Sequence, residues 1–168
     1  MKPTSEITIP NTGYRIGKPV KLLIFSVGDS KFGALVEDVR TIIDLEEAEE
    51  NIRYDSEVNC VYEKGKVVIQ AINLSNLLSQ NPNDNHENRE RKLIVVKTNL
   101  NSLNGVIVDH IEGVGTFSGI YPFPFGIFKN AGSFFKYVVT SEEPWFEVVD
   151  FSKIIEIYGF QMAKVENV

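Results

Sequence analysis

The sequence predicts an all-β protein, mainly strands with a few short helices. Short apolar runs alternate with turn residues along most of its 168 positions, as in KLLIFSVGDSKFGALV at 21–36. This pattern is typical of antiparallel hairpins. The segments between the runs are too short for the helical crossovers that join parallel strands. Whole blocks of sequence also recur along the chain.

The first half of the chain contains five predicted strands and one helix. They are, in order, two strands within 21–36, a helical turn and a strand within 37–45, two strands within 60–72 that turn at Glu63-Lys64-Gly65, and a helix at 73–79. Asn73 precedes the apolar residues of this helix, and an Asn side chain there can accept a hydrogen bond from a free N–H of the first turn. We therefore expect Asn73 to be the N-cap.

The second half repeats this arrangement. Strands are predicted at 92–98, 103–109, 114–117, 134–140 and 145–150, followed by a helix at 151–158. The segment at 80–91 has no aliphatic or aromatic residue and predicts a surface loop. The segment SGIYPFPFGIF at 118–128 is aromatic and rich in proline. It is either a loop packed over a barrel end or a partly exposed apolar patch that docks a partner.

Three sequence blocks recur in the same order and at nearly constant spacing. KLLIF at 21–25 matches KLIVV at 92–96, GALVEDV at 33–39 matches GVIVDHI at 105–111, and NLS at 73–75 matches DFS at 150–152. This recurrence predicts an internal duplication of about 21–79 and 92–158. We expect one domain at 20–158, preceded by a flexible arm at 1–19 and followed by a tail at 159–168.

Composition excludes several classes of function. The net charge of −6 has the wrong sign for binding nucleic acid or anionic membranes. A single cysteine, Cys60, excludes an internal disulfide framework and suits a reducing compartment. The chain shows no signal peptide, and no apolar run reaches the ~20 residues of a membrane helix. These features predict a cytoplasmic protein.

The Asp109-His110 pair in GVIVDHIEGV is the strongest candidate for chemistry. In the repeat it aligns with Glu37-Asp38, so we interpret it as a solvated polar corner after a strand. The other histidine, His86, lies in the polar loop, and Cys60 begins a hairpin. No metal-ligand spacing or phosphate-binding loop is present. The sequence therefore predicts no enzyme, no cofactor and no metal site.

Four segments together resemble the CheW coupling proteins of bacterial chemotaxis. They are LLIFSVGDSKFGALVEDVRTII, EKGKVVIQAINLSNLL, GVIVDHIEGV and WFEVVDFSKIIEIY, and the resemblance covers about 20–158. It implies a fold of two small five-stranded barrels, each similar to a Src-homology-3 barrel. It also implies a non-enzymatic adaptor, which links the helical hairpin tip of a chemoreceptor to the regulatory domain of a CheA-type histidine kinase.

The resemblance also implies partner-binding residues. They are Val36 and Val39 from the first half of an apolar groove, Gly105, Val108, Ile111 and Val114 from its second half, and Lys64 and Gly65 at the central hairpin. The sequence departs from the family at this hairpin. Lys64 replaces an arginine and so loses the planar, two-pronged contact. Gln70 and Asn73 replace the Pro and Asp that usually follow.

Two alternatives to the receptor–kinase adaptor stay open. One is a diverged CheW-like interaction domain that serves a different signalling partner. The other is a β-barrel protein that binds a small ligand or catalyses hydrolysis. A cluster of His, Asp and Ser around a closed cavity would favour the second alternative, whereas an open apolar groove between two barrels would favour an adaptor.

Overall fold

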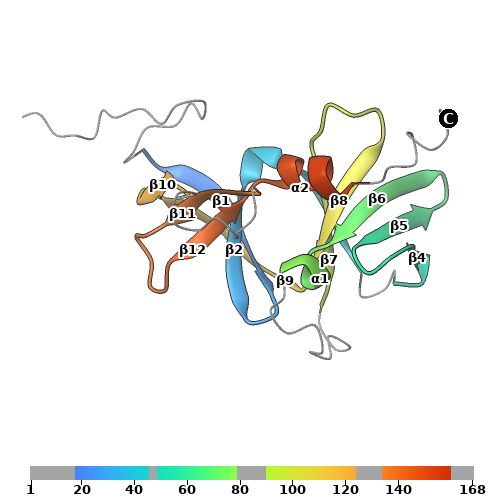
Figure 1. The fold of residues 1–168 in the computed structure, drawn as a ribbon, viewed down its shortest axis with the longest axis horizontal. Coiled ribbons are helices and arrows are strands. Elements are labelled where there is room, and N and C mark those ends of the chain that lie inside the picture. The colour runs from blue at the N-terminus through green and yellow to red at the C-terminus, as the bar shows by residue number, and fades with distance from the viewer. Residues whose placement is uncertain (1–17, 46–48, 79–89, 124–133, 160–168) are drawn as a thin grey trace, which may run out of the picture.

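The computed structural model describes residues 18–45, 49–78, 90–123 and 134–159, whose strands form two sheets at opposite ends of an elongated molecule (Figure 1). Sheet 1 contains β1 (Val20–Val27), β2 (Ser30–Leu35), β9 (His110–Phe117), β10 (Ile120–Pro122), β11 (Phe135–Val139) and β12 (Phe146–Val149). Sheet 2 contains β3 (Val39–Asp44), β4 (Ile52–Tyr54), β5 (Asn59–Lys64), β6 (Val67–Asn73), β7 (Lys92–Val96) and β8 (Leu103–Val108). The predicted all-β class is confirmed.

Each half of the chain contributes strands to both sheets. After β1 and β2 the chain passes through the 3₁₀ turn η2 (Val36–Asp38) into β3 of sheet 2, and after β7 and β8 it passes through Asp109 into β9 of sheet 1. We call these two passages the first and second crossovers. The strand orders are β10-β11-β12-β2-β1-β9 in sheet 1 and β4-β5-β6-β8-β7-β3 in sheet 2. Each strand of one sheet therefore corresponds to the strand six numbers away in the other sheet, for example β4 to β10 and β8 to β2.

The turns and helix caps follow the local sequence. Gly28 and Gly65 have φ angles of 60° and 62° at the tips of the two predicted hairpins, a conformation that glycine adopts without steric cost. In the short helix α1 (Leu74–Leu78), Asn73 Oδ1 accepts a hydrogen bond of 3.1 Å from the Ser75 N–H. The predicted N-cap is confirmed. Asp150 caps α2 (Phe151–Tyr158) by accepting from the Lys153 N–H.

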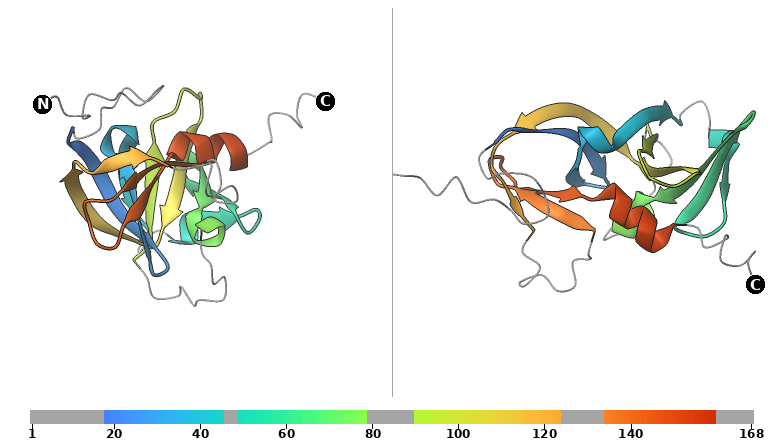
Figure 2. Two further views of the ribbon diagram at one scale, coloured as in Figure 1. Left: turned by 60° about the vertical axis from the view of Figure 1, so that its left-hand side comes forward. Right: turned by 90° about the horizontal axis from the view of Figure 1, so that it is seen from above.

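Three apolar clusters stabilise this arrangement. One fills sheet 1 around Leu22, Tyr137 and Phe146, and another fills sheet 2 around Tyr62 and Leu93. The third, which we call the central cluster, draws on both sheets and both helices. Its members include Phe25, Phe32, Leu74, Ile94, Val106, Val108, Phe151 and Ile154. Figure 2 shows α2 lying between the two sheets. The central cluster therefore packs sheet 1 against sheet 2.

Two strands were not predicted. The short strands β4 and β10, of three residues each, raise each sheet from five strands to six. Residues 1–17 of the predicted arm and nearly all of the predicted tail lie outside the described residues, as do most of the polar loop at 80–91 and the segment at 124–133. No helix within the described residues is long and apolar enough to span a membrane.

Candidate partner-binding site

Three of the predicted groove residues border the central cluster and remain partly exposed. Val36 lies in η2, Val39 begins β3 opposite Val96, and Ile111 lies in β9 opposite Phe25. Each packs against the central cluster as a partly buried apolar side chain. The structure therefore brings residues from both halves of the chain to the edge of one apolar cluster between the two sheets.

A shallow depression lies beside the first crossover. It has a volume of about 330 Å³ and is lined by Pro19, Val20, Lys21, Leu35, Val36 and Glu37. Val114 lies further along β9, opposite Leu23, and is 57% exposed. The depression is open rather than closed, and no His, Asp or Ser lines it.

Gly105 and Val108 require a correction. Both lie in β8, and both are buried. A Cβ atom added at Gly105 would lie 2.7 Å from the Ile94 carbonyl oxygen, so glycine is needed for close packing of β8 on β7. The Val108 side chain is part of the central cluster. Neither residue can line a surface groove in this conformation.

Lys64 and Gly65 form a separate surface. They lie at the tip of the β5–β6 hairpin, are exposed, and belong to the end of the molecule occupied by sheet 2 (Figure 1). The two positions that depart from the family follow along β6. Gln70 is partly buried, and Asn73 is buried at the helix cap described above. The predicted residues that are at least partly exposed therefore belong to two distinct surfaces.

Asp109 requires a second correction, because it is not a solvated corner. Its side chain is 0% exposed. Its carboxylate accepts hydrogen bonds of 2.6 Å from the Gly28 N–H and 2.6 Å from the Ser75 hydroxyl. His110, the next residue, is exposed. Asp109 therefore joins the β1–β2 turn of sheet 1 to α1, which follows sheet 2.

The first crossover has different electrostatics. Asp38 is partly buried, and burial raises the pKa of its carboxyl group, an effect opposed by the nearby charge of Lys136. Glu37 beside it is exposed. In sheet 2, burial raises the pKa of the Cys60 thiol to about 11, so this thiol stays protonated near neutral pH. Within the described residues, no three His, Cys, Asp or Glu side chains lie close enough together to hold a metal ion.

Comparison with known proteins adds to this geometry. The profile of the CheW-like domain matches residues 21–119, which is more than half of the chain. The chain belongs to the CheW-like domain family. The two-unit fold is that of the family, which supports a role as a chemotaxis scaffold or adaptor. CheW-like proteins are non-enzymatic scaffold proteins, which supports placing this chain among scaffolds rather than enzymes.

A solved structure extends the likeness of this CheW-like protein beyond the matched residues. It is the crystal structure of the scaffolding protein TtCheW from Thermoanaerobacter tengcongensis, with a TM-score of 0.61 and 18% sequence identity. The match covers 86% of this chain and 98% of the other. At this identity the likeness is one of fold. A search of curated proteins found no match.

Two exposed aromatic residues in or next to the strands of sheet 1 were not predicted as site residues. Tyr121 in β10 and Trp145, which directly precedes β12, are 42% and 61% exposed. The aromatic segment at 118–128 was a sequence signal for Tyr121. Trp145 is the only tryptophan of the CheW-like chain, but its exposure depends on the sheet register and could not be inferred from its neighbours.

Proposed function

We propose that this CheW-like protein is a non-enzymatic cytoplasmic adaptor that couples a chemoreceptor-like helical hairpin to a CheA-type histidine kinase. In this proposal the CheW-like domain spans 20–158, and residues 1–19 and 159–168 are an arm and a tail. The two halves of the domain are proposed to have arisen by duplication. The identical strand order of the two sheets after a shift of six strands supports the duplication.

The observation that carries the proposal is the partial exposure of Val36, Val39 and Ile111 around the central cluster. These side chains are apolar, come from both crossovers, and are not fully covered by the protein itself. A helix that presents apolar residues along one face could cover them and remove the remaining apolar surface from water. Such burial contributes about 25 cal/mol per Å².

The hairpin tip with Lys64 and Gly65 is the proposed contact for the kinase. It lies on sheet 2, away from the crossovers, so the two partners could bind at the same time. A lysine there offers a flexible point charge, whereas an arginine would offer two parallel hydrogen bonds. We therefore expect this adaptor to hold its kinase less specifically than family members with arginine.

The proposal is tested by adding charge at the two crossovers. Val39→Asp and Ile111→Asp should each weaken binding of a recombinant chemoreceptor helical hairpin by about 1–3 kcal/mol, the scale of burying an aliphatic side chain. The measurement is isothermal titration calorimetry with the receptor hairpin as titrant. Leu100→Asp is the matched control, because Leu100 is an exposed apolar residue in the β7–β8 connection.

Three outcomes can be distinguished. Weakened binding in the two crossover variants, with unchanged thermal unfolding and a normal Leu100 control, supports the adaptor. Unchanged binding in folded crossover variants contradicts the proposed groove. Loss of the cooperative unfolding transition would assign Val39 and Ile111 to the core instead.

The departure at Lys64 favours a second candidate, a CheW-like domain that serves a different signalling partner. This candidate predicts that binding to a CheA-type regulatory domain is insensitive to both Lys64→Arg and Lys64→Glu. The same calorimetric measurement, with the kinase regulatory domain as titrant, separates the two candidates.

A further inference from the structure

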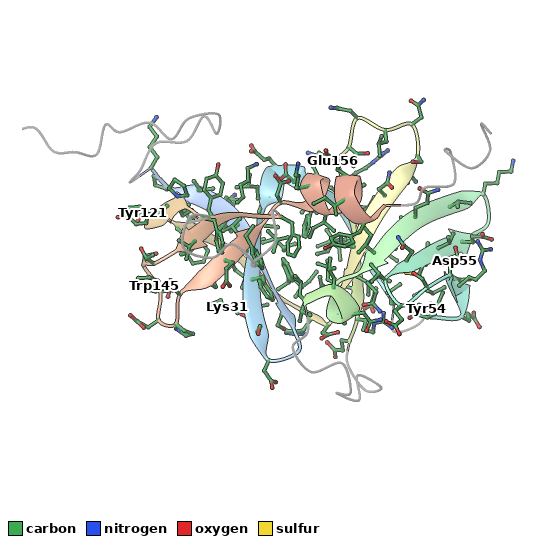
Figure 3. All side chains as sticks on the ribbon, viewed as in Figure 1. Lys31, Tyr54, Asp55, Tyr121, Trp145 and Glu156 are labelled. Carbon is green, nitrogen blue, oxygen red and sulfur yellow. The ribbon has the colours of Figure 1, made fainter. Side chains whose placement is uncertain are left out.

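The outer face of β10, β11 and β12 carries an exposed aromatic surface at the end of the molecule opposite sheet 2. Figure 3 places Tyr121 and Trp145 at this end. Trp145 is the most exposed large apolar side chain among the described residues. Single exposed apolar residues are ordinary on protein surfaces, so a binding surface here also requires a continuous exposed face between these two side chains.

The strand register places these side chains on one face. Tyr121 lies opposite Val138 in β11, and Val138 lies opposite Glu147 in β12. Trp145 stands two residues before Glu147, and alternate residues of a strand point to the same side. Thr140, whose N–H donates to the Gly119 carbonyl, extends the same row of β11. We call Tyr121, Val138, Thr140 and Trp145 the aromatic platform.

The residues between the two aromatic rings of this platform are small and only partly buried. Val138 and Thr140 are partly exposed, and Gly119 beside Thr140 has no side chain. A Cβ atom at Gly119 would lie 2.8 Å from Ser141 Cβ, so a larger residue would disturb this corner. Two aromatic rings on either side of exposed backbone and small side chains can accommodate an extended peptide segment.

The charge around the platform is negative. Glu142 and Glu143 lie in the turn before Trp145 and are exposed, and Glu147 lies on the same face. Two lysines of β2 and β11 have other contacts. Lys31 Nζ lies 4.9 Å from the centre of the Phe146 ring, and the charge of Lys136 acts on Asp38 at the first crossover.

We propose that the aromatic platform binds an extended cationic segment of a partner protein, in which lysine or arginine alternates with apolar residues. A cation over the Trp145 or Tyr121 ring is attracted by the electrons of the ring face. The carboxylates of Glu142, Glu143 and Glu147 add charge complementarity, and the apolar residues of the segment would cover Val138. This site goes beyond the receptor and kinase contacts and does not use their residues.

The single tryptophan provides a direct assay. A short synthetic peptide of lysine, leucine and proline is titrated into the full chain while Trp145 fluorescence is followed. We expect a saturable change in emission, with a blue shift as the ring becomes covered, and a weaker affinity at high salt because exposed charges are screened. The same peptide with glutamate in place of lysine should produce no saturable change.

Variants are measured by anisotropy of the labelled lysine peptide, so that loss of Trp145 does not remove the signal. Trp145→Ala should weaken binding about tenfold and Trp145→Phe less, because the phenyl ring retains part of the cation–π attraction. The double variant Glu142→Gln with Glu143→Gln should weaken binding and flatten its salt dependence. Leu100→Ala, an exposed apolar residue in the β7–β8 connection, is the control and should bind as the parent does.

Three results would overturn the proposal. They are no saturable response to the lysine peptide, an equal response to the glutamate peptide, and a Trp145 emission change that depends on protein concentration alone. The last result would identify a second copy of the chain as the occupant. All of these readouts are independent of receptor or kinase binding, so the platform and the adaptor proposal can fail separately.

Discussion

Replacing Asp109 with alanine should cost about 2–6 kcal/mol of folding free energy. The carboxylate is fully buried and accepts 2.6 Å hydrogen bonds from the Gly28 N–H and the Ser75 hydroxyl. Alanine leaves both donors without this acceptor, and each buried unsatisfied group costs about 1–3 kcal/mol. Since small domains are stable by only about 5–15 kcal/mol, the loss would be a large fraction of the total.

Graded substitutions test whether the hydrogen bonds are the cause. In Asp109→Asn the amide oxygen can still accept from Gly28, and the amide nitrogen can donate to the Ser75 hydroxyl, which rotates to accept. We expect a smaller loss of about 1–3 kcal/mol, because bonds to a charged acceptor become bonds to a neutral group. Ser75→Ala removes one donor and should cost a similar amount.

The assay is urea denaturation of each variant, followed by circular dichroism. The double variant of Asp109 and Ser75 should cost at least about 0.5 kcal/mol less than the sum of the single alanine variants, because both remove the same bond. Glu112→Ala is the matched control: Glu112 is an exposed carboxylate of β9, and its loss should change stability by less than about 0.5 kcal/mol. A stability of Asp109→Ala equal to that of the Glu112 variant would refute the reasoning.

Three further predictions follow from single contacts. Lys64→Arg should change stability by less than about 0.5 kcal/mol and maintain or strengthen calorimetric binding to a CheA-type regulatory domain, whereas Lys64→Glu should weaken it. Burial raises the pKa of the Cys60 thiol from 9.0 to about 11. The contribution of the protonated thiol to the free energy of unfolding is therefore complete below pH 9 and is lost as the pH rises toward 11. Cys60→Ala should flatten the pH dependence of the free energy of unfolding, measured by urea denaturation, over that range. Gly105→Ala should destabilise the protein by about 1–3 kcal/mol in the same assay, because its Cβ would lie 2.7 Å from the Ile94 carbonyl oxygen.

Much of the fold could be predicted because its signals are local. The turns at Gly28 and Gly65 need positive φ angles, and glycine in a polar dipeptide or tripeptide between apolar runs marks such turns. Asn73 marked a helix start for a similar reason. The strands β4 and β10 escaped prediction because three residues are too few to show an alternating pattern.

The site was harder to predict because burial depends on distant contacts. In β8, Val106 and Val108 belong to the central cluster while Ile107 belongs to the core of sheet 2, so both faces of the strand are covered. The apolar sequence GVIV shows that the strand is buried but cannot show which residues reach a surface. The sequence could not show that Asp109 is buried, because its two hydrogen-bond donors lie 81 and 34 positions away in the chain.

The two crossovers show how repeated architecture can carry different chemistry. At the second crossover, the buried Asp109 carboxylate ties sheet 1 to α1. At the first crossover, the aligned Glu37 is exposed, Asp38 is only partly buried, and an open depression lies beside Val36. A partner can bind only where apolar surface is accessible and is not covered by contacts within the protein itself. For this reason we place the centre of the proposed partner groove at the first crossover, and we expect Val39→Asp to weaken receptor binding more than Ile111→Asp.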